Sequence, residues 1–258
     1  MRVLVGLVAI GAIISATSPA DARPQRRTTK HQDQKSKKRA ARIHTLREHT
    51  RVELRELARG QSVGAPWAGR LQHATELPSG DGYHIRHPWR AFGTQTTIEL
   101  TLRAIDQTLE AFPDQHVLAI GDISAESGGR ITEHHSHQSG RDIDVGLFYL
   151  DKPAGYPATF IHATEDNLDC AATFKLLESF LATADDDGGV LMIFLDFDVQ
   201  GILYDWARDQ GISERRLDRI FQYPHGRDSS DGIVRHEPNH DNHMHVRFTC
   251  PSTDSGCH

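Results

Sequence analysis

Beyond its N-terminus, this chain of 258 residues lacks any long hydrophobic run. The one apolar stretch, Val3–Ala16, is shorter than the roughly 20 apolar residues that a membrane-spanning helix needs. We therefore expect no stable insertion into a membrane. The chain also lacks an internal repeat, which excludes repeat architectures such as solenoids.

The first 22 residues have the features of a secretory signal peptide. Arg2 supplies the charged start, Val3–Ala16 the short apolar core, and Ala20–Ala22 the end with small residues on either side of Asp21. This pattern predicts a secreted, periplasmic protein whose mature chain begins at Arg23. No cysteine lies near the cleavage point, so we expect no lipid anchor there.

Cysteine is scarce, with Cys170, Cys250 and Cys257 all in the part predicted to be exported. An oxidising compartment permits disulfides. Cys250 and Cys257 could pair, or one of them could pair with Cys170, and an odd number leaves at least one thiol free or paired between chains.

Basic residues are scarce after residue 59. Residues 23–59 contain 13 Lys or Arg against four Asp or Glu, whereas residues 60–258 contain 15 against 30. The basic segment has too few large apolar residues for a core, so we predict a disordered arm, with a helix in its second half. It could bind an anionic polymer or membrane surface, but a solvated spacer is the simpler interpretation. An acidic secreted domain is not expected to bind nucleic acid.

Residues 60–258 are enough for one domain. Apolar spacing predicts four helices and three buried strands, and a helix before Pro113 is the clearest. We expect helices over 96–112, 168–182, 199–208 and 213–221, strands over 117–123, 142–149 and 190–195, and a final strand near 243–248 after a long loop over 224–239. This order predicts an α+β domain with a small antiparallel sheet flanked by helices.

Histidine, by contrast, is abundant: the chain has 17, and six of them lie in two clusters at 134–144 and 240–245. Side chains alternate between the two faces of a strand, so His243 and His245 share one face while Met244 and Val246 point into the core. Asp142 and Asp144 share a face in the same way. Two such strands side by side would bring polar faces together.

On neighbouring strands, His137, Asp144 and His245 could bind a single ion. Histidine nitrogen and carboxylate oxygen are ordinary zinc ligands, and three protein ligands leave one position open, as in a catalytic site. The competing interpretation is a histidine-rich surface tract or core histidines that only satisfy hydrogen bonds. The alternating apolar residues and the spacing of Asp144 argue against it.

The two clusters resemble motifs of the penicillin-insensitive murein endopeptidases. Residues 136–144 are similar to the first motif of that family and residues 240–248 to its last. The family is part of a larger group with lysostaphin, D-alanyl-D-alanine carboxypeptidases and the hedgehog signalling domain, and this resemblance implies a fold with the zinc site on its sheet. The resemblance covers roughly Gly64 to Phe248.

The resemblance implies a zinc metallopeptidase that cuts D-alanyl-diamino acid cross-links between peptidoglycan stem peptides. His243 would be the general base, or stabilise the oxyanion, and His240 is the alternative. His134 corresponds to a ligand of an additional metal ion in some members, but its partner residues are not found between Tyr149 and Asn167. The other functions to weigh are a carboxypeptidase acting on uncross-linked stems and a non-catalytic zinc-containing binding domain.

Other polar residues near the clusters have less specific interpretations. Asp142 is expected to orient a ligand through a hydrogen bond. Arg141, Arg247 and Gln138 could bind a substrate carboxylate, and buried structural pairs within the protein explain them equally well. Retention of both His240 and His243 favours an enzyme over a binding domain.

Overall fold

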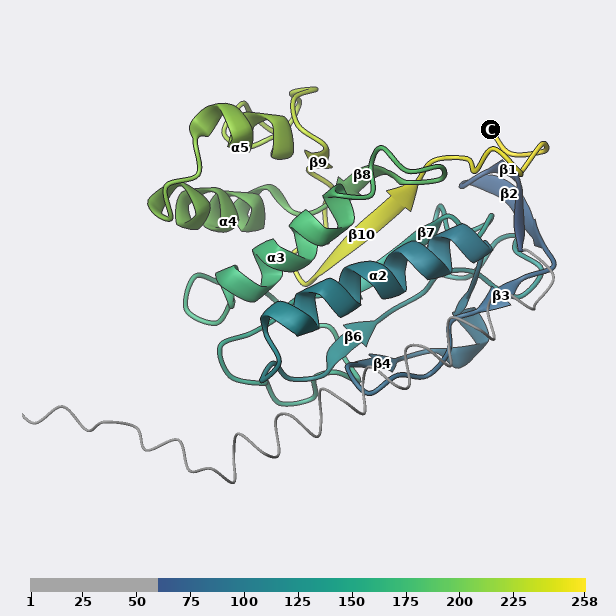
Figure 1. The fold of residues 1–258 in the computed structure, drawn as a ribbon, viewed down its shortest axis with the longest axis horizontal. Coiled ribbons are helices and arrows are strands. Elements are labelled where there is room, and N and C mark those ends of the chain that lie inside the picture. Colours follow the sequence, from purple (N-terminus) through teal and green to yellow (C-terminus); the bar gives the residue numbers. More distant parts are fainter. Residues whose placement is uncertain (1–59) are drawn as a thin grey trace, which may run out of the picture.

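The computed structural model describes residues 60–258 (Figure 1). The predicted signal peptide over 1–22, the basic arm over 23–59 and the helix within that arm lie outside the described residues. Within residues 60–258, no helix has the length and apolar character needed to cross a bilayer. The described part is a mixed α+β structure, as predicted.

Six strands form the main sheet, in the order β4-β6-β7-β10-β8-β9. Their bounds are β4 Tyr83–Ile85, β6 Leu118–Ile120, β7 Asp142–Gly146, β8 Val190–Phe194, β9 Val234–Arg235 and β10 His243–Phe248. The four central strands are antiparallel, which confirms the prediction for the middle of the sheet.

At both edges of the sheet, however, the pairs β4–β6 and β8–β9 are parallel. The prediction of an antiparallel sheet was wrong there, and β9 lies within the segment predicted as a long loop. Parallel neighbours need a crossover connection. Helices supply it in both cases, because α2 (Gln95–Ala111) lies between β4 and β6, and α4 (Phe197–Asp209) and α5 (Glu214–Ile220) lie between β8 and β9.

The helices lie close to their predicted positions. Helix α2 begins after Thr94, whose hydroxyl accepts a hydrogen bond from the Thr97 amide at 3.0 Å. Helix α3 (Cys170–Leu181) begins after Asp169, whose carboxylate accepts from the Ala172 amide at 3.0 Å. Figure 1 shows α2 and α3 side by side over one face of the sheet. The other face of the central strands is therefore left for polar side chains.

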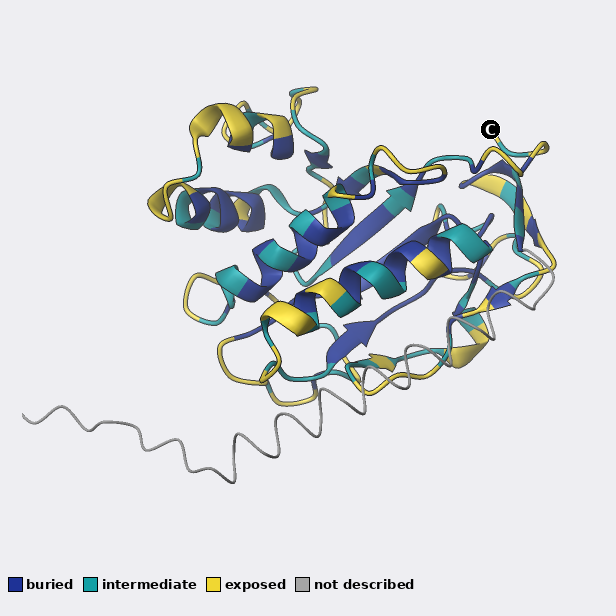
Figure 2. Ribbon diagram, in the orientation of Figure 1, coloured by how far each residue is buried: buried dark blue, intermediate teal, exposed yellow. Residues whose placement is uncertain are grey.

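The core lies between the sheet and these helices (Figure 2). On β10, Met244, Val246 and Phe248 are fully buried, as the alternation predicted. A residue of β7, Val145, is equally buried beside them. Both strands of the predicted site are thus anchored by apolar side chains on the face opposite the histidines.

Smaller elements close the other end of the molecule. They are the pair β1 (Gln61–Ala65) and β2 (Ala68–Gln72), the pair β3 (Thr75–Glu76) and β5 (Phe92–Gly93), and the 3-10 helix Pro88–Arg90.

Cys250 and Cys257 form a disulfide and Cys170 is a free thiol, which decides between the pairings left open by the sequence.

Candidate metal centre and active site

Strands β7 and β10 bring the two histidine motifs together. In their antiparallel register His245 lies opposite Asp144, and Arg247 lies opposite Asp142. The expectation that the two motifs occupy neighbouring strands is confirmed. The backbone ladder, rather than any loop, therefore sets the spacing between His245 and Asp144.

His137 reaches the same place from the loop before β7. It has a left-handed backbone, with φ of 63°, and its amide donates to the Asp142 carboxylate at 3.1 Å. Its Nδ1 lies 3.0 Å from the Ile123 carbonyl oxygen, which can only accept, so Nδ1 carries the proton. The other ring nitrogen, Nε2, faces Asp144 Oδ1 at 3.2 Å. A neutral imidazole held in this tautomer is the form that ligates metals.

His245 completes the group from the other strand. Its Nδ1 lies 3.2 Å from Asp144 Oδ1, and its Nε2 lies 3.3 Å from Asp142 Oδ1. The rings of His137 and His245 are 4.6 Å apart between centroids. One carboxylate oxygen, Asp144 Oδ1, is thus shared by two imidazoles that come from different parts of the chain.

These side chains are buried, yet several of their polar atoms have no hydrogen-bond partner. His137 Nε2, Asp144 Oδ1 and His245 Nε2 are all buried and make no hydrogen bond, and their contacts within the group are the ion-pair distances of 3.2 and 3.3 Å. Leaving buried polar atoms unpaired costs free energy, so each requires an explanation. Nitrogen and oxygen atoms converging at one point suit a divalent cation, and the residues present therefore fit a metal site.

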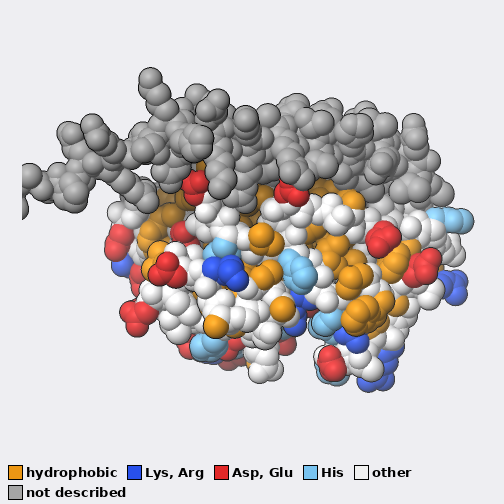
Figure 3. All heavy atoms as spheres, turned by 90° about the horizontal axis from the view of Figure 1, so that it is seen from below, with side chains coloured by type: hydrophobic (Ala, Val, Ile, Leu, Met, Phe, Trp, Pro, Cys, Tyr) orange, Lys and Arg blue, Asp and Glu red, His pale blue; other side chains and the backbone are white. Residues whose placement is uncertain are grey.

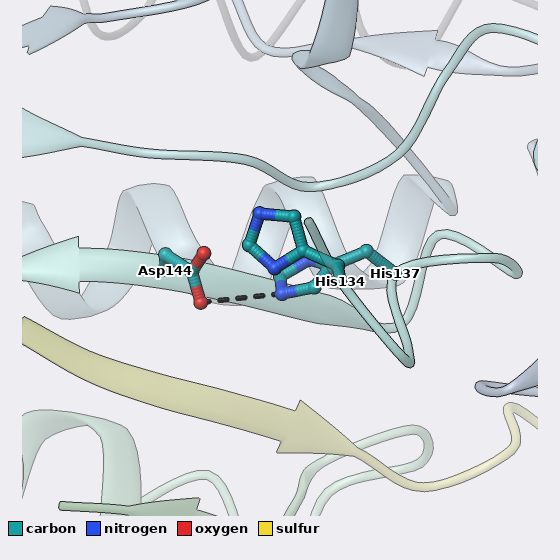
Figure 4. A group of neighbouring side chains, drawn as sticks. All are labelled: His134, His137 and Asp144. Carbon is teal, nitrogen blue, oxygen red and sulfur yellow. Dashed lines mark ion pairs between the residues drawn. The ribbon is translucent and has the colours of Figure 1, made fainter. Parts of the chain in front are cut away.

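His134 belongs to the same group (Figure 4). With His137 and Asp144 it offers ligand atoms that all lie within 4.8 Å of one another, a set that could hold a metal ion. This set differs from the predicted one, which has His245 in place of His134. His134 Nε2 already faces Asp122 Oδ2 at 3.0 Å, whereas His245 contacts Asp144 directly, so we place more weight on His245. An additional metal at His134 stays a prediction.

Charge in the group is balanced by the two aspartates. Burial raises the pKa of the Asp144 carboxyl, but the imidazoles of His137 and His243 more than compensate and hold it well below its usual range. Burial likewise opposes the charged form of His245, and the carboxylates of Asp142 and Asp144 nevertheless raise its pKa to about 9. Both carboxylates are therefore ionised at neutral pH and attract a cation.

His243 lies on the same face of β10, at the edge of the group. Its Nδ1 is 2.6 Å from the Asn242 side-chain oxygen, and its Nε2 is 3.7 Å from Asp144 Oδ1. Burial is the main cause that lowers the pKa of His243 to about 3, so the ring is neutral. An unprotonated Nε2 facing the group is able to accept a proton.

His240 is brought to the same side. Its ring centroid lies 4.7 Å from that of His243, and its Nδ1 lies 2.9 Å from the Pro238 carbonyl oxygen. Burial lowers its pKa as well. Both histidines weighed for proton transfer are thus adjacent to the group, with His243 nearer to Asp144. Figure 3 shows histidine side chains among hydrophobic ones on one face of the molecule.

The other polar residues of the motifs separate into distinct roles. Asp142 contacts three members of the site, since its carboxylate also lies 2.7 Å from Arg247 Nε. Arg141 is buried and donates to the carbonyl oxygens of Phe248 and His258, which is a structural role. Gln138 donates to the His135 carbonyl oxygen at 3.3 Å. The two arginines are thus held by partners within the protein.

A second group of polar residues around the site was not predicted. The buried Asp122 carboxylate lies 2.7 Å from both His87 Nδ1 and Arg90 Nη1, besides its contact with His134. Burial opposes ionisation of Asp122, but these partners hold its pKa well below the usual range. His87 and Arg90 lie about 45 residues before the first motif, so no local spacing in the sequence pointed to them.

A family model matches part of the chain. No curated protein matches the chain. The segment that the family model matches includes the first histidine motif and ends within α3. The second motif lies outside that segment and joins the site through the pairing of β10 with β7. Residues 62–175 match the family model described as penicillin-insensitive murein endopeptidase, which confirms the resemblance for this part of the chain.

Proposed function

We propose that this protein is a zinc-dependent endopeptidase that hydrolyses D-alanyl-diamino acid cross-links between peptidoglycan stem peptides. The family match supports a peptidase that acts on murein. The observation that carries the metal part is the group of buried nitrogen and oxygen atoms at Asp144 that make no hydrogen bond. The nature of the ion and the bond that is cut are the parts of the proposal that go beyond this support.

We assign His137, Asp144 and His245 as the zinc ligands. His137 is held in the required tautomer by the Ile123 carbonyl, and His245 is held beside Asp144 by the strand register. A zinc ion bound there would polarise the scissile carbonyl and make hydroxide available at neutral pH. The chain itself supplies the rigid frame and the two ionised carboxylates.

We assign the proton transfers to His243. Its neutral Nε2 accepts a proton from the attacking water and returns it to the leaving amine, or stabilises the oxyanion once protonated. His240 is close enough to share in these steps and is the alternative. No serine or cysteine nucleophile enters this route, so no acyl-enzyme forms and β-lactams should not inhibit the enzyme.

We place this activity in the periplasm, because the sequence pattern of residues 1–22 is typical of a signal peptide and murein lies outside the inner membrane. The basic residues of 23–59 then connect the export signal to an acidic domain. A spacer role remains the simpler proposal for this arm, with binding to an anionic polymer as its alternative.

The experiment that tests the function is chromatography of purified cross-linked peptidoglycan fragments after incubation with the mature protein, with and without a chelator. We expect conversion of dimers to monomers that the chelator stops and added zinc restores. Trimming of monomer stems alone would show a carboxypeptidase instead. No change of either substrate by protein with bound zinc would show a non-catalytic binding domain.

A further inference from the structure

The loop between β7 and α3 packs against the proposed proton-transfer residue. Phe160, from this loop, stacks on the imidazole of His243, with ring centroids 4.7 Å apart and an angle of only 6° between the planes. The guanidinium of Arg86 also lies over the Phe160 ring, with its Cζ 4.1 Å from the ring centroid. Arg86 Nε in turn donates to the Ala158 carbonyl oxygen at 3.1 Å, which ties the arginine to the same loop.

The space for the Phe160 ring is made by a glycine. A side-chain carbon at Gly121 would come within 2.8 Å of both Phe160 Cζ and Asp144 Cβ. That distance is too short for two carbon atoms in contact. Because residue 121 has no side chain, the Phe160 ring fits between the segment that follows β6, the start of β10 and Arg86.

Two further contacts hold this loop to the segment before β10. The Ala163 amide donates to the Asp241 carbonyl oxygen at 2.8 Å, and His162 Nδ1 lies 2.8 Å from an Asp241 carboxylate oxygen. The loop thus contacts the chain on both sides of Asn242. Its position relative to His243 is set by main-chain as well as side-chain interactions.

The contacts of Phe160 and Asn242 restrain different motions of the His243 ring. A parallel stack limits tilting of the imidazole plane. The contact between Nδ1 and the Asn242 oxygen limits rotation within that plane and selects the tautomer with the proton on Nδ1. Together they keep Nε2 directed toward Asp144.

We propose that Phe160 and Asn242 are positioning residues that hold His243 with its Nε2 toward the metal group. The proposal rests on the assignment of His243 as the proton-transfer residue. A displacement of about 1 Å at a reacting group can cost on the order of 100-fold in rate. A loop that contributes no ligand therefore contributes to the rate through the orientation of one ring.

The test compares Phe160→Leu, which keeps apolar bulk but removes the flat ring, with Phe160→Tyr, which keeps the ring. We expect Phe160→Leu to lower kcat at least about 10-fold with KM and zinc content unchanged, and Phe160→Tyr to restore most of the rate. Phe112→Leu, at the end of α2, is the matched control and should leave kcat unchanged. Equal kcat for Phe160→Leu and the wild-type protein would overturn the proposal.

A second measurement does not depend on turnover. Nitrogen-15 NMR of the histidine rings should show His243 as a single Nδ1-protonated tautomer in the wild-type protein. Asn242→Ala should mix the tautomers, and Phe160→Leu should broaden the ring signals. If the wild-type protein fails to cut murein but shows this signature, the proposed function is wrong and the positioning stands. Unchanged spectra in both variants would refute the positioning itself.

Discussion

The two sides of the site are built in different ways. On the ligand side, His137, Asp144 and His245 are at most 6% exposed and are fixed by strand register and a backbone carbonyl. On the proton-transfer side, His240 and His243 are partly exposed and are held by a side-chain amide, a loop carbonyl and a stacked ring. The proposed ligands are thus fixed by the sheet, whereas the proposed proton-transfer residues are held by loop contacts.

Removal of a metal ligand that lies on a strand should have the largest effect on the site. We expect His245→Ala to lose zinc and activity together, because only two of the three assigned ligands remain. Metal analysis of the purified protein and the dimer-cleavage assay measure this. His84→Ala, which removes an exposed histidine on β4 of the same sheet, should retain both. A variant at 245 that keeps full zinc would refute the ligand assignment.

Removal of the proton-transfer group should reduce activity without affecting metal binding. We expect His243→Ala to keep its zinc and lose about 100- to 10,000-fold in kcat, the usual contribution of general acid-base catalysis. The same assay on His240→Ala decides between the two histidines, and we expect the smaller loss there. Zinc loss in His243→Ala equal to that in His245→Ala would end the division of roles.

A weaker effect is expected one contact away from the ligands. Asp142→Asn keeps the shape of the side chain but removes the charge that faces His245 and Arg247. We expect the zinc affinity to fall about 10- to 100-fold, as for other groups that orient metal ligands. Competition with a chelator of known affinity measures this, and an unchanged affinity would show that Asp142 only pairs with Arg247.

The smallest effect is expected outside both sides of the site. A protein that begins at Gly60 lacks the basic arm but keeps every residue of the site. We expect its kcat/KM on soluble cross-linked fragments to equal that of the mature chain. Activity on intact murein sacculi, measured in parallel, shows whether the arm contributes to binding the polymer. A large loss on the soluble fragments would contradict a spacer role.

The shared faces of the two central strands could be predicted because the information for them is local. The alternation of polar and apolar residues in 142–145 and 243–248 indicated which side chains share a face, and the structure confirms it. The helices were predicted for the same reason, since their apolar spacing and capping residues lie within one segment. The edge strands β4 and β9 were missed because two or three residues carry no measurable period.

The sequence by itself thus determined the four helices, the central strands and the shared faces of β7 and β10. Only the tertiary structure decided that β7 and β10 are neighbours, that Cys250 pairs with Cys257, and that Asp122 and Phe160 support the site. Each of these depends on a contact with a segment that local spacing does not specify. Such contacts form only when the buried core brings those segments together, so no local pattern records them.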